Sequence, residues 1–182
     1  MARWVALLRG VNVNGITVRS AELAELFREL GFAEVRTVLA SGNVCFDAED
    51  PADAAAGGAQ AAELKSRIER ALGERFGYDA WIVLVPLDRL AGVIDAYPFA
   101  QDAEHHAYVV FAADDDALRA VLADAPEAAP GTAEQVEAGD GVVYWRCPRG
   151  SSTDTPFSKH LARARFKTST TTRNLNTLHK LG

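Results

Sequence analysis

Residues 4–15 read Trp4-Val5-Ala6-Leu7-Leu8-Arg9-Gly10-Val11-Asn12-Val13-Asn14-Gly15, and this stretch decides the fold. Its leading apolar run predicts a strand that is buried on both faces and lies in the middle of a sheet. The strand ends at Arg9-Gly10, and a loop of Val, Asn and Gly leads to a helix that begins near Ser20. A cation and two asparagines between a central strand and a helix indicate a polar site on a rigid scaffold. No reaction can be read from them.

The first half of the chain predicts the element order β-α-β-β-α-β. The expected strands and helices cover residues 3–9, 21–30, 34–39, 43–46, 60–76 and 80–85. This order is the split β-α-β arrangement of the ferredoxin-like fold. The crossover rule makes the first two strands parallel and inserts the third between them. We therefore expect the loop over 9–12 and the tight turn at 41–43 to meet at one edge of the sheet.

The second half predicts a less regular order of helices and strands. Helices are expected over residues 87–96, 114–123, 155–166 and 173–181, and strands over 106–111, 132–137 and 142–146. A hydroxyl-rich link, 168–172, precedes the last helix. No internal repeat is found in the sequence. The predicted fold class is α+β, with a ferredoxin-like subdomain over residues 1–86 and a smaller α+β subdomain over 87–182, packed as one compact unit.

The charges of the chain are unevenly distributed. Residues 146–182 hold eight Lys or Arg and one acid, a net charge of +7, and the rest of the chain carries −13, which gives −6 in all. An acidic body with a basic tail indicates that the tail either docks on the body or binds an anion. Internal docking with a solvated basic face is the simpler of these alternatives.

Cysteines and apolar runs bear on the compartment of the protein. Cys45 and Cys147 are far apart and form no CxxC motif, which favours a reduced, cytosolic protein over a disulfide. No signal peptide is recognisable, and no apolar run approaches the roughly 20 residues that span a bilayer. We therefore expect a cytoplasmic protein without a membrane partner. The oligomeric state cannot be predicted.

Four stretches, taken together, resemble one bacterial family. They are Ala6-Leu7-Leu8-Arg9-Gly10-Val11-Asn12-Val13, Ala40-Ser41-Gly42-Asn43-Val44, Tyr97-Pro98-Phe99, and Thr172-Arg173-Asn174-Leu175-Asn176-Thr177-Leu178-His179-Lys180-Leu181. In their order and spacing they are similar to the family called domain of unknown function 1697. The resemblance implies a two-part α+β fold with a ferredoxin-like N-terminal portion, and it brings no established activity. Leu175 stands where the family usually has Trp, which favours a core role over a stacking role at that position.

Two groups of polar residues are candidate binding sites. The first is Arg9, Asn12, Asn14, Ser41 and Asn43, in which a guanidinium and neutral donors suit a phosphate or carboxylate. Its alternative is structural, because Asn also shapes loops and turns and Arg9 can pair with an acid. The second is Lys159, Arg163, Arg173, Asn174 and Asn176. Lys159 and Arg163 are expected on one helical face, and Arg173 and Asn174 in the first turn of the last helix; the alternative is a solvated basic face.

Three functions are compatible with these residues. The leading hypothesis is a non-enzymatic binding module for an anionic ligand, either a nucleic acid or a phosphorylated small molecule. A second is an enzyme acting on a phosphate- or carboxylate-bearing metabolite, with Lys159 or His160 as acid or base. A third is a structural or interaction protein whose basic tail docks internally. No metal site or cofactor is predicted, because no motif with ligand spacing or a phosphate-cradling glycine loop occurs.

Overall fold

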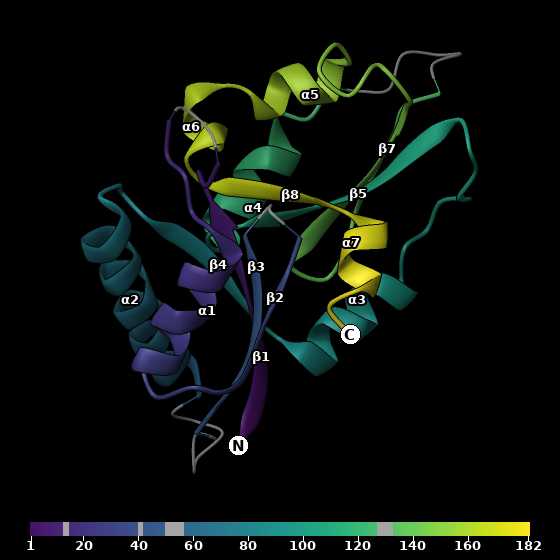
Figure 1. Ribbon diagram of the computed structural model, residues 1–182. Coiled ribbons are helices and arrows are strands. Elements are labelled where there is room, and N and C mark those ends of the chain that lie inside the picture. The colour runs from purple at the N-terminus through teal and green to yellow at the C-terminus, as the bar shows by residue number, and fades with distance from the viewer. Residues whose placement is uncertain (13–14, 40–41, 50–56, 127–132) are drawn as a thin grey trace. The chain divides into compact units, whose positions relative to one another are not determined.

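The computed structural model describes residues 1–12, 15–39, 42–49, 57–126 and 133–182 (Figure 1). The chain divides into two compact units. Unit 1 comprises Met1–Leu90 with Lys180–Gly182, and unit 2 comprises Ala91–His179. None of the helices in the described ranges has both the length and the apolar character needed to cross a membrane.

Unit 1 has the predicted β-α-β-β-α-β order. Its elements are β1 (Ala2–Arg9), α1 (Ser20–Glu29), β2 (Ala33–Val38), β3 (Asn43–Ala48), α2 (Gly57–Phe76) and β4 (Trp81–Pro86), followed by α3 (Leu87–Asp95), which continues into unit 2. The sheet order is β2-β3-β1-β4. Since β3 is antiparallel to both β1 and β2, the first two strands are parallel with the third between them. The ferredoxin-like topology is therefore confirmed.

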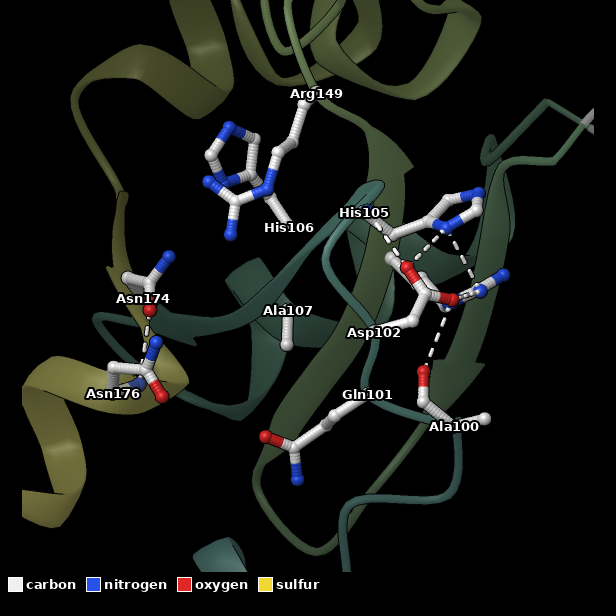
Figure 2. A pocket seen from close by; sticks show the side chains of 10 residues that line it. Ala100, Gln101, Asp102, His105, His106, Ala107, Arg149, Asn174 and Asn176 are labelled. Atoms are coloured by element: carbon white, nitrogen blue, oxygen red, sulfur yellow. Dashed lines mark hydrogen bonds and ion pairs between the residues drawn. The ribbon is translucent and has the colours of Figure 1, made fainter.

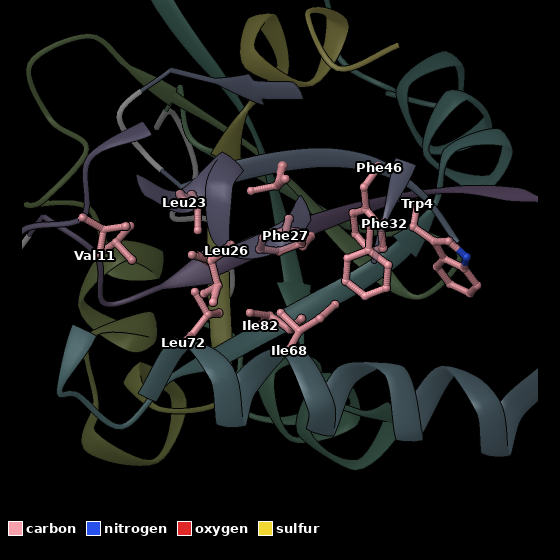
Figure 3. Close-up of a cluster of buried hydrophobic side chains, with 14 of the residues drawn as sticks. Trp4, Val11, Leu23, Leu26, Phe27, Phe32, Phe46, Ile68, Leu72 and Ile82 are labelled. Atoms are coloured by element: carbon pink, nitrogen blue, oxygen red, sulfur yellow. The ribbon is translucent and has the colours of Figure 1, made fainter. Parts of the chain in front are cut away.

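The core of unit 1 lies between the sheet and the helices α1 and α2 (Figure 3). Three phenylalanine rings form its centre: Phe46 on β3 lies 5.1 Å from Phe27 and 4.6 Å from Phe32, measured between ring centroids. Along β1, Val5 and Leu7 on the opposite face are fully buried too. The apolar run therefore forms a strand buried on both faces, as predicted.

The loop after β1 and the turn before β3 meet, as the topology requires. The backbone N–H of Leu8 donates to the carbonyl of Gly42 over 2.8 Å. Gly42 has a φ of +74°, and a Cβ at this position would come within 2.6 Å of Cγ2 of Val11. The turn therefore requires glycine for its conformation and for the close approach of the loop.

Unit 2 repeats the topology of unit 1. Its elements are β5 (His105–Ala112), α4 (Asp115–Ala123), β6 (Gln135–Ala138), β7 (Val142–Pro148), α5 (Pro156–Leu161), α6 (Ala164–Lys167), β8 (Thr170–Asn174) and α7 (Leu175–His179). The sheet order β6-β7-β5-β8 places its four strands as β2-β3-β1-β4 are placed in unit 1, with antiparallel neighbours throughout. The absence of a sequence repeat concealed this duplication.

Two expectations for the C-terminal region were wrong. The predicted helix 155–166 is divided into α5 and α6, because Arg163 has extended backbone angles (φ −60°, ψ 143°) and is the N-cap of α6. Lys159 and Arg163 therefore do not share a helical face. Arg173 and Asn174 lie in strand β8 and not in a helix. The β-branched run Thr170-Thr171-Thr172 favours a strand, which the sequence interpretation treated as a link.

The core of unit 2 contains a buried carboxylate. Glu134 is 5% exposed and accepts hydrogen bonds from Nε1 of Trp145 (3.1 Å) and the backbone N–H of Phe157 (3.2 Å). Phe157 lies in the first turn of α5, where a negative charge is favourable. Glu134 thus links strand β7 to the start of α5. The N-cap of that helix is Thr155, and Pro156 follows it in the first turn.

Candidate functional site

A small polar cavity in unit 2 is the candidate site (Figure 2). It has a volume of about 40 Å³. Its walls come from the loop before β5, the start of β5, the end of β7 and the junction of β8 with α7. The lining residues are Ala100, Gln101, Asp102, His105, His106, Ala107, Arg146, Arg149, Asn174 and Asn176.

The cavity arises where one strand of the sheet ends early. Strand β7 pairs with β5 from His105 to Phe111, whereas β8 pairs with β5 only from Tyr108 to Ala112. After Asn174 the chain turns directly into α7. The first residues of β5 therefore lie beyond the end of β8, and this gap in the sheet becomes the hollow.

Asp102 organises one wall of the cavity. Its Oδ1 accepts from Nδ1 of His105 (2.8 Å) and from the backbone N–H groups of Glu104 and His105 (both 2.9 Å). Its Oδ2 accepts from Nη2 of Arg146 at 2.5 Å. The hydrogen bonds from His105 and Arg146 hold the pKa of the Asp102 carboxyl well below its usual range. Asp102 is therefore ionised at neutral pH, and both of its oxygens are occupied by groups of the protein.

Arg146 is fixed by several acceptors at once. Besides the ion pair with Asp102, its Nε donates to the carbonyl of Ala100 (3.0 Å) and its Nη1 to Oε1 of Gln135 (3.1 Å). A guanidinium held at three points has little freedom to rotate. Arg146 therefore contributes a positive charge of fixed position to the cavity wall.

Asn174 is oriented by a bond to the following helix. Its Oδ1 accepts from the backbone N–H of Asn176 over 2.9 Å. Because this bond engages the oxygen of the amide, the Nδ2 group is left to donate elsewhere. In Figure 2 the amide nitrogen of Asn174 points away from Asn176, toward the side of the cavity where Arg149 is drawn.

Arg149 and His106 complete the lining. Arg149 follows β7, and its backbone N–H donates to the carbonyl of Glu104 over 2.8 Å. Across the described ranges, Arg149 forms no ion pair with a carboxylate, and its guanidinium lines the cavity together with the imidazole of His106. Two guanidinium groups against one carboxylate give the lining a net charge of +1 with both imidazoles neutral.

The residues of the second predicted group are separated by the structure. Asn174 and Asn176 line the cavity, but Arg173 is buried and alternates with Asn174 along β8, so it faces the other side of the sheet. Nη1 of Arg173 donates to Oγ1 of Thr171 over 2.7 Å. Lys159 and Arg163 are exposed and are not among the lining residues.

Three residues of the first predicted group, Arg9, Asn12 and Asn43, are described, and they lie in unit 1 near the point where the loop and the turn meet. Asn12 has a φ of +56°, and its Oδ1 accepts from the backbone N–H of Val18 over 3.0 Å. Asn43 is fully buried and donates from Nδ2 to the carbonyl of Val38 over 2.8 Å. These bonds shape the loop and the turn. Arg9 is the half-buried last residue of β1, and a ligand role for this group stays a prediction. Asn14 and Ser41 are outside the described residues.

Comparison with known proteins decides the family. The model of the family described as Protein of unknown function (DUF1697) matches residues 1–144. The chain belongs to this family. The resemblance that the sequence indicated is thereby confirmed. Leu175, for which a core role is expected, is buried in this DUF1697 protein. Four of the cavity residues, Arg146, Arg149, Asn174 and Asn176, follow the matched range.

The fold is similar to that of a solved structure. It is "the structure of conserved bacterial protein SP0830 from Streptococcus pneumoniae", with a TM-score of 0.76 and 22% sequence identity. The similarity covers 99% of this chain and 96% of that chain. At this level of identity the comparison shows the α+β fold alone. No curated protein matches the chain.

Sequence reasoning missed most of the residues that line the cavity of this DUF1697 protein. The sequence interpretation assigns no role to His105 or His106, and it includes Arg146 and Arg149 only in the net charge of residues 146–182. One local signal was present: Asp102 stands three residues before His105, a spacing that lets a carboxylate accept from the backbone and the ring of the histidine. The sequence interpretation contained no strand at β8, and so it could not predict that Asn174 lies near these residues.

His160, the second candidate acid or base, lies in the core of unit 2. It is 2% exposed, its ring lies 4.6 Å from that of Phe166, and its Nε2 donates to the carbonyl of Val121 over 2.9 Å. Because a carbonyl only accepts, Nε2 carries the proton in this contact. His160 therefore packs as a core residue and does not reach a ligand at the surface.

Proposed function

We propose that this DUF1697 protein binds one small anionic group in the cavity of unit 2. The observation that supports the proposal is the balance of donors and acceptors in the lining. The carboxylate of Asp102 and the amide oxygen of Asn174 already accept hydrogen bonds from the protein. The guanidinium of Arg149 and the Nδ2 group of Asn174 remain as donors, and the lining as a whole carries a net positive charge. Such a lining complements an acceptor-rich anion.

The size of the cavity sets the size of the bound group. One water molecule needs about 10–15 Å³ of such a space. A volume of about 40 Å³ therefore accommodates a phosphate- or carboxylate-sized group. The rest of the ligand would lie outside the cavity.

A single anionic group favours a small-molecule ligand over a nucleic acid strand. A nucleic acid strand that is neutralised by several cations binds with an affinity that falls steeply with salt. The logarithm of its association constant falls against the logarithm of the salt concentration with a slope of about −0.7 to −0.9 per phosphate contact. The proposed site contacts one group. We therefore expect a slope of about −1 or shallower for any oligonucleotide that binds, and a slope of about −4 or steeper would instead indicate a nucleic acid surface elsewhere on the protein.

The test is calorimetric titration of the purified protein with inorganic phosphate. Arg149→Ala removes the cavity cation that has no carboxylate partner in the described chain, and hydrogen bonds to charged groups contribute about 1.5–3 kcal/mol, so we expect affinity to fall by roughly 10- to 100-fold. The matched control is Arg119→Ala, which removes an exposed arginine paired with Asp116 on α4 of the same unit. Binding that is absent in the wild type, or lost equally in both variants, refutes the proposal.

A further inference from the structure

Residues Lys180–Gly182 belong to unit 1, although they follow a stretch of the chain that belongs to unit 2. The carbonyls of Lys180 and Leu181 accept hydrogen bonds from Arg36 on β2, from its Nη1 over 3.1 Å and its Nη2 over 3.0 Å. One forked side chain thus holds the segment on the sheet. We propose that this segment is a clasp that opens without unfolding of unit 1 and that masks the thiol of Cys45 when it is closed.

Cys45 lies beneath the clasp. It is opposite Val5 of β1, on the face of the sheet away from Phe46 and the helices, and it is 3% exposed. Its Sγ donates to the carbonyl of Leu181 over 3.5 Å. A carbonyl oxygen accepts from a thiol but repels a thiolate, so the closed clasp favours the protonated, unreactive form. Burial also raises the pKa of Cys45, which the nearby charge of Arg36 opposes.

Few contacts hold the clasp closed. Of its three residues only Leu181 is buried, and Lys180 and Gly182 are exposed. Arg36 is exposed too, so water competes for its hydrogen bonds. The strands beneath are held instead by the sheet ladder and the core of unit 1. Because a segment with few buried contacts opens at a lower free energy than a whole unit, the clasp opens first and uncovers Cys45.

The experiment measures how fast N-ethylmaleimide labels Cys45 in the native full chain at about pH 8, where a thiol with an ordinary pKa is partly ionised. Peptide mass spectrometry separates Cys45 from Cys147, which is fully buried in the core of unit 2 and serves as an internal reference. Arg36→Lys keeps the positive charge and loses the forked donor, and Leu181→Ala removes the buried anchor. Each should raise the labelling rate of Cys45 by roughly tenfold.

Two further variants separate the clasp from other effects. Arg75→Ala is the matched control, because it removes an arginine of unit 1 whose ion pairs join α2 to Glu25 and Glu29 of α1. It should leave the labelling rate of Cys45 unchanged. Arg36→Ala removes a charge that lowers the pKa of the thiol, and this effect alone would slow labelling. Opening of the clasp predicts faster labelling instead.

The urea dependence of labelling distinguishes opening from unfolding. Opening of a short segment exposes little surface, so the labelling rate of Cys45 should change little with urea below the unfolding transition. A rate that rises with urea as steeply as that of Cys147 overturns the proposal, because the thiol is then reached by unfolding. Wild-type labelling rates in both Arg36→Lys and Leu181→Ala overturn it as well, provided that the far-ultraviolet spectrum of each variant is that of the folded protein.

Discussion

Replacing Gly42 by alanine tests the meeting of the β1 loop and the β3 turn, on which the structure of unit 1 depends. Gly42 has a φ of +74°, and a Cβ there would lie 2.6 Å from Cγ2 of Val11 and 2.9 Å from Cβ of Leu8. Val11 is 8% exposed and Leu8 1% exposed, so neither side chain has free space to move into. Gly42→Ala therefore combines a strained backbone with an overlap in the core.

The magnitude follows from these two effects. An L-residue in the left-handed region costs about 1–2 kcal/mol, and overpacking of a well-packed core costs about 1–3 kcal/mol. Gly42→Ala should therefore lower the free energy of unfolding by about 2–5 kcal/mol. Gly31 provides the control, because its φ is +85° but a Cβ there meets nothing within 4 Å. Gly31→Ala should cost only the backbone contribution of about 1–2 kcal/mol.

Urea unfolding of the two variants gives the comparison. Both substitutions stiffen the unfolded chain equally, so this contribution cancels between them. The difference of about 1–3 kcal/mol in the free energy of unfolding isolates the contact with Val11 and Leu8. If Gly42→Ala is no less stable than Gly31→Ala, the loop and the turn do not meet as described, and the topological argument is refuted.

Two further predictions concern titrating groups. Asp102 has a pKa below its ordinary value of 3.8, so its ionised form stabilises the fold at higher pH. The wild type should therefore be more stable than Asp102→Asn, by its full amount above pH about 5 and by less as the pH falls below about 4. Urea unfolding midpoints measured across this pH range give the comparison. An advantage that does not change with pH contradicts this assignment. Burial raises the pKa of Tyr78 to about 12, from 10.0, so the fold should lose stability as the pH rises from about 10 to about 12. In a pH titration followed at 295 nm, Tyr78→Phe should remove part of the phenolate absorbance that appears at the highest pH. A spectrum in which all phenols of the native protein ionise near pH 10 would show that Tyr78 is not buried.

The fold of unit 1 was predictable because its signals are local and consistent. The buried run of β1, the helical spacing of Leu23, Leu26 and Phe27 in α1, and the Gly42 turn all indicate the same topology, and the crossover rule orders the strands. The end of β1 and the turn before β3 also lie close together, as this topology predicts. The pattern could not show that the side chains of Asn12 and Asn43 would form hydrogen bonds with nearby backbone groups, those of Val18 and Val38.

The candidate site was predictable only in part, because it depends on one short strand. Five residues, Thr170–Asn174, are too few to show a clear alternation, and the apolar residues that follow at Leu175 and Leu178 resemble a longer helix. The helix predicted over 173–181 places Asn174 in its first turn, and so does not place it in a strand beside β5. Its neighbours in space, Arg149 and His106, lie about 25 and 70 residues away in the sequence, so only the pairing of β8 with β5 places them together.

The repeated topology lets the two units be compared at the point where the fourth strand of each sheet ends. In unit 1, β4 pairs with β1 only from Trp4 onward and then enters α3 at once, as β8 enters α7 in unit 2. By register, Arg3 opposite Asp47 corresponds to Ala107 opposite Arg146. Arg3 and Asp47 form an ion pair at 2.8 Å and neutralise each other. In unit 2 the corresponding alanine carries no charge, and Arg146 pairs instead with Asp102 of the loop before β5. The charge at this paired position is therefore met within the strand pair in unit 1, and by a loop residue that lines the cavity in unit 2.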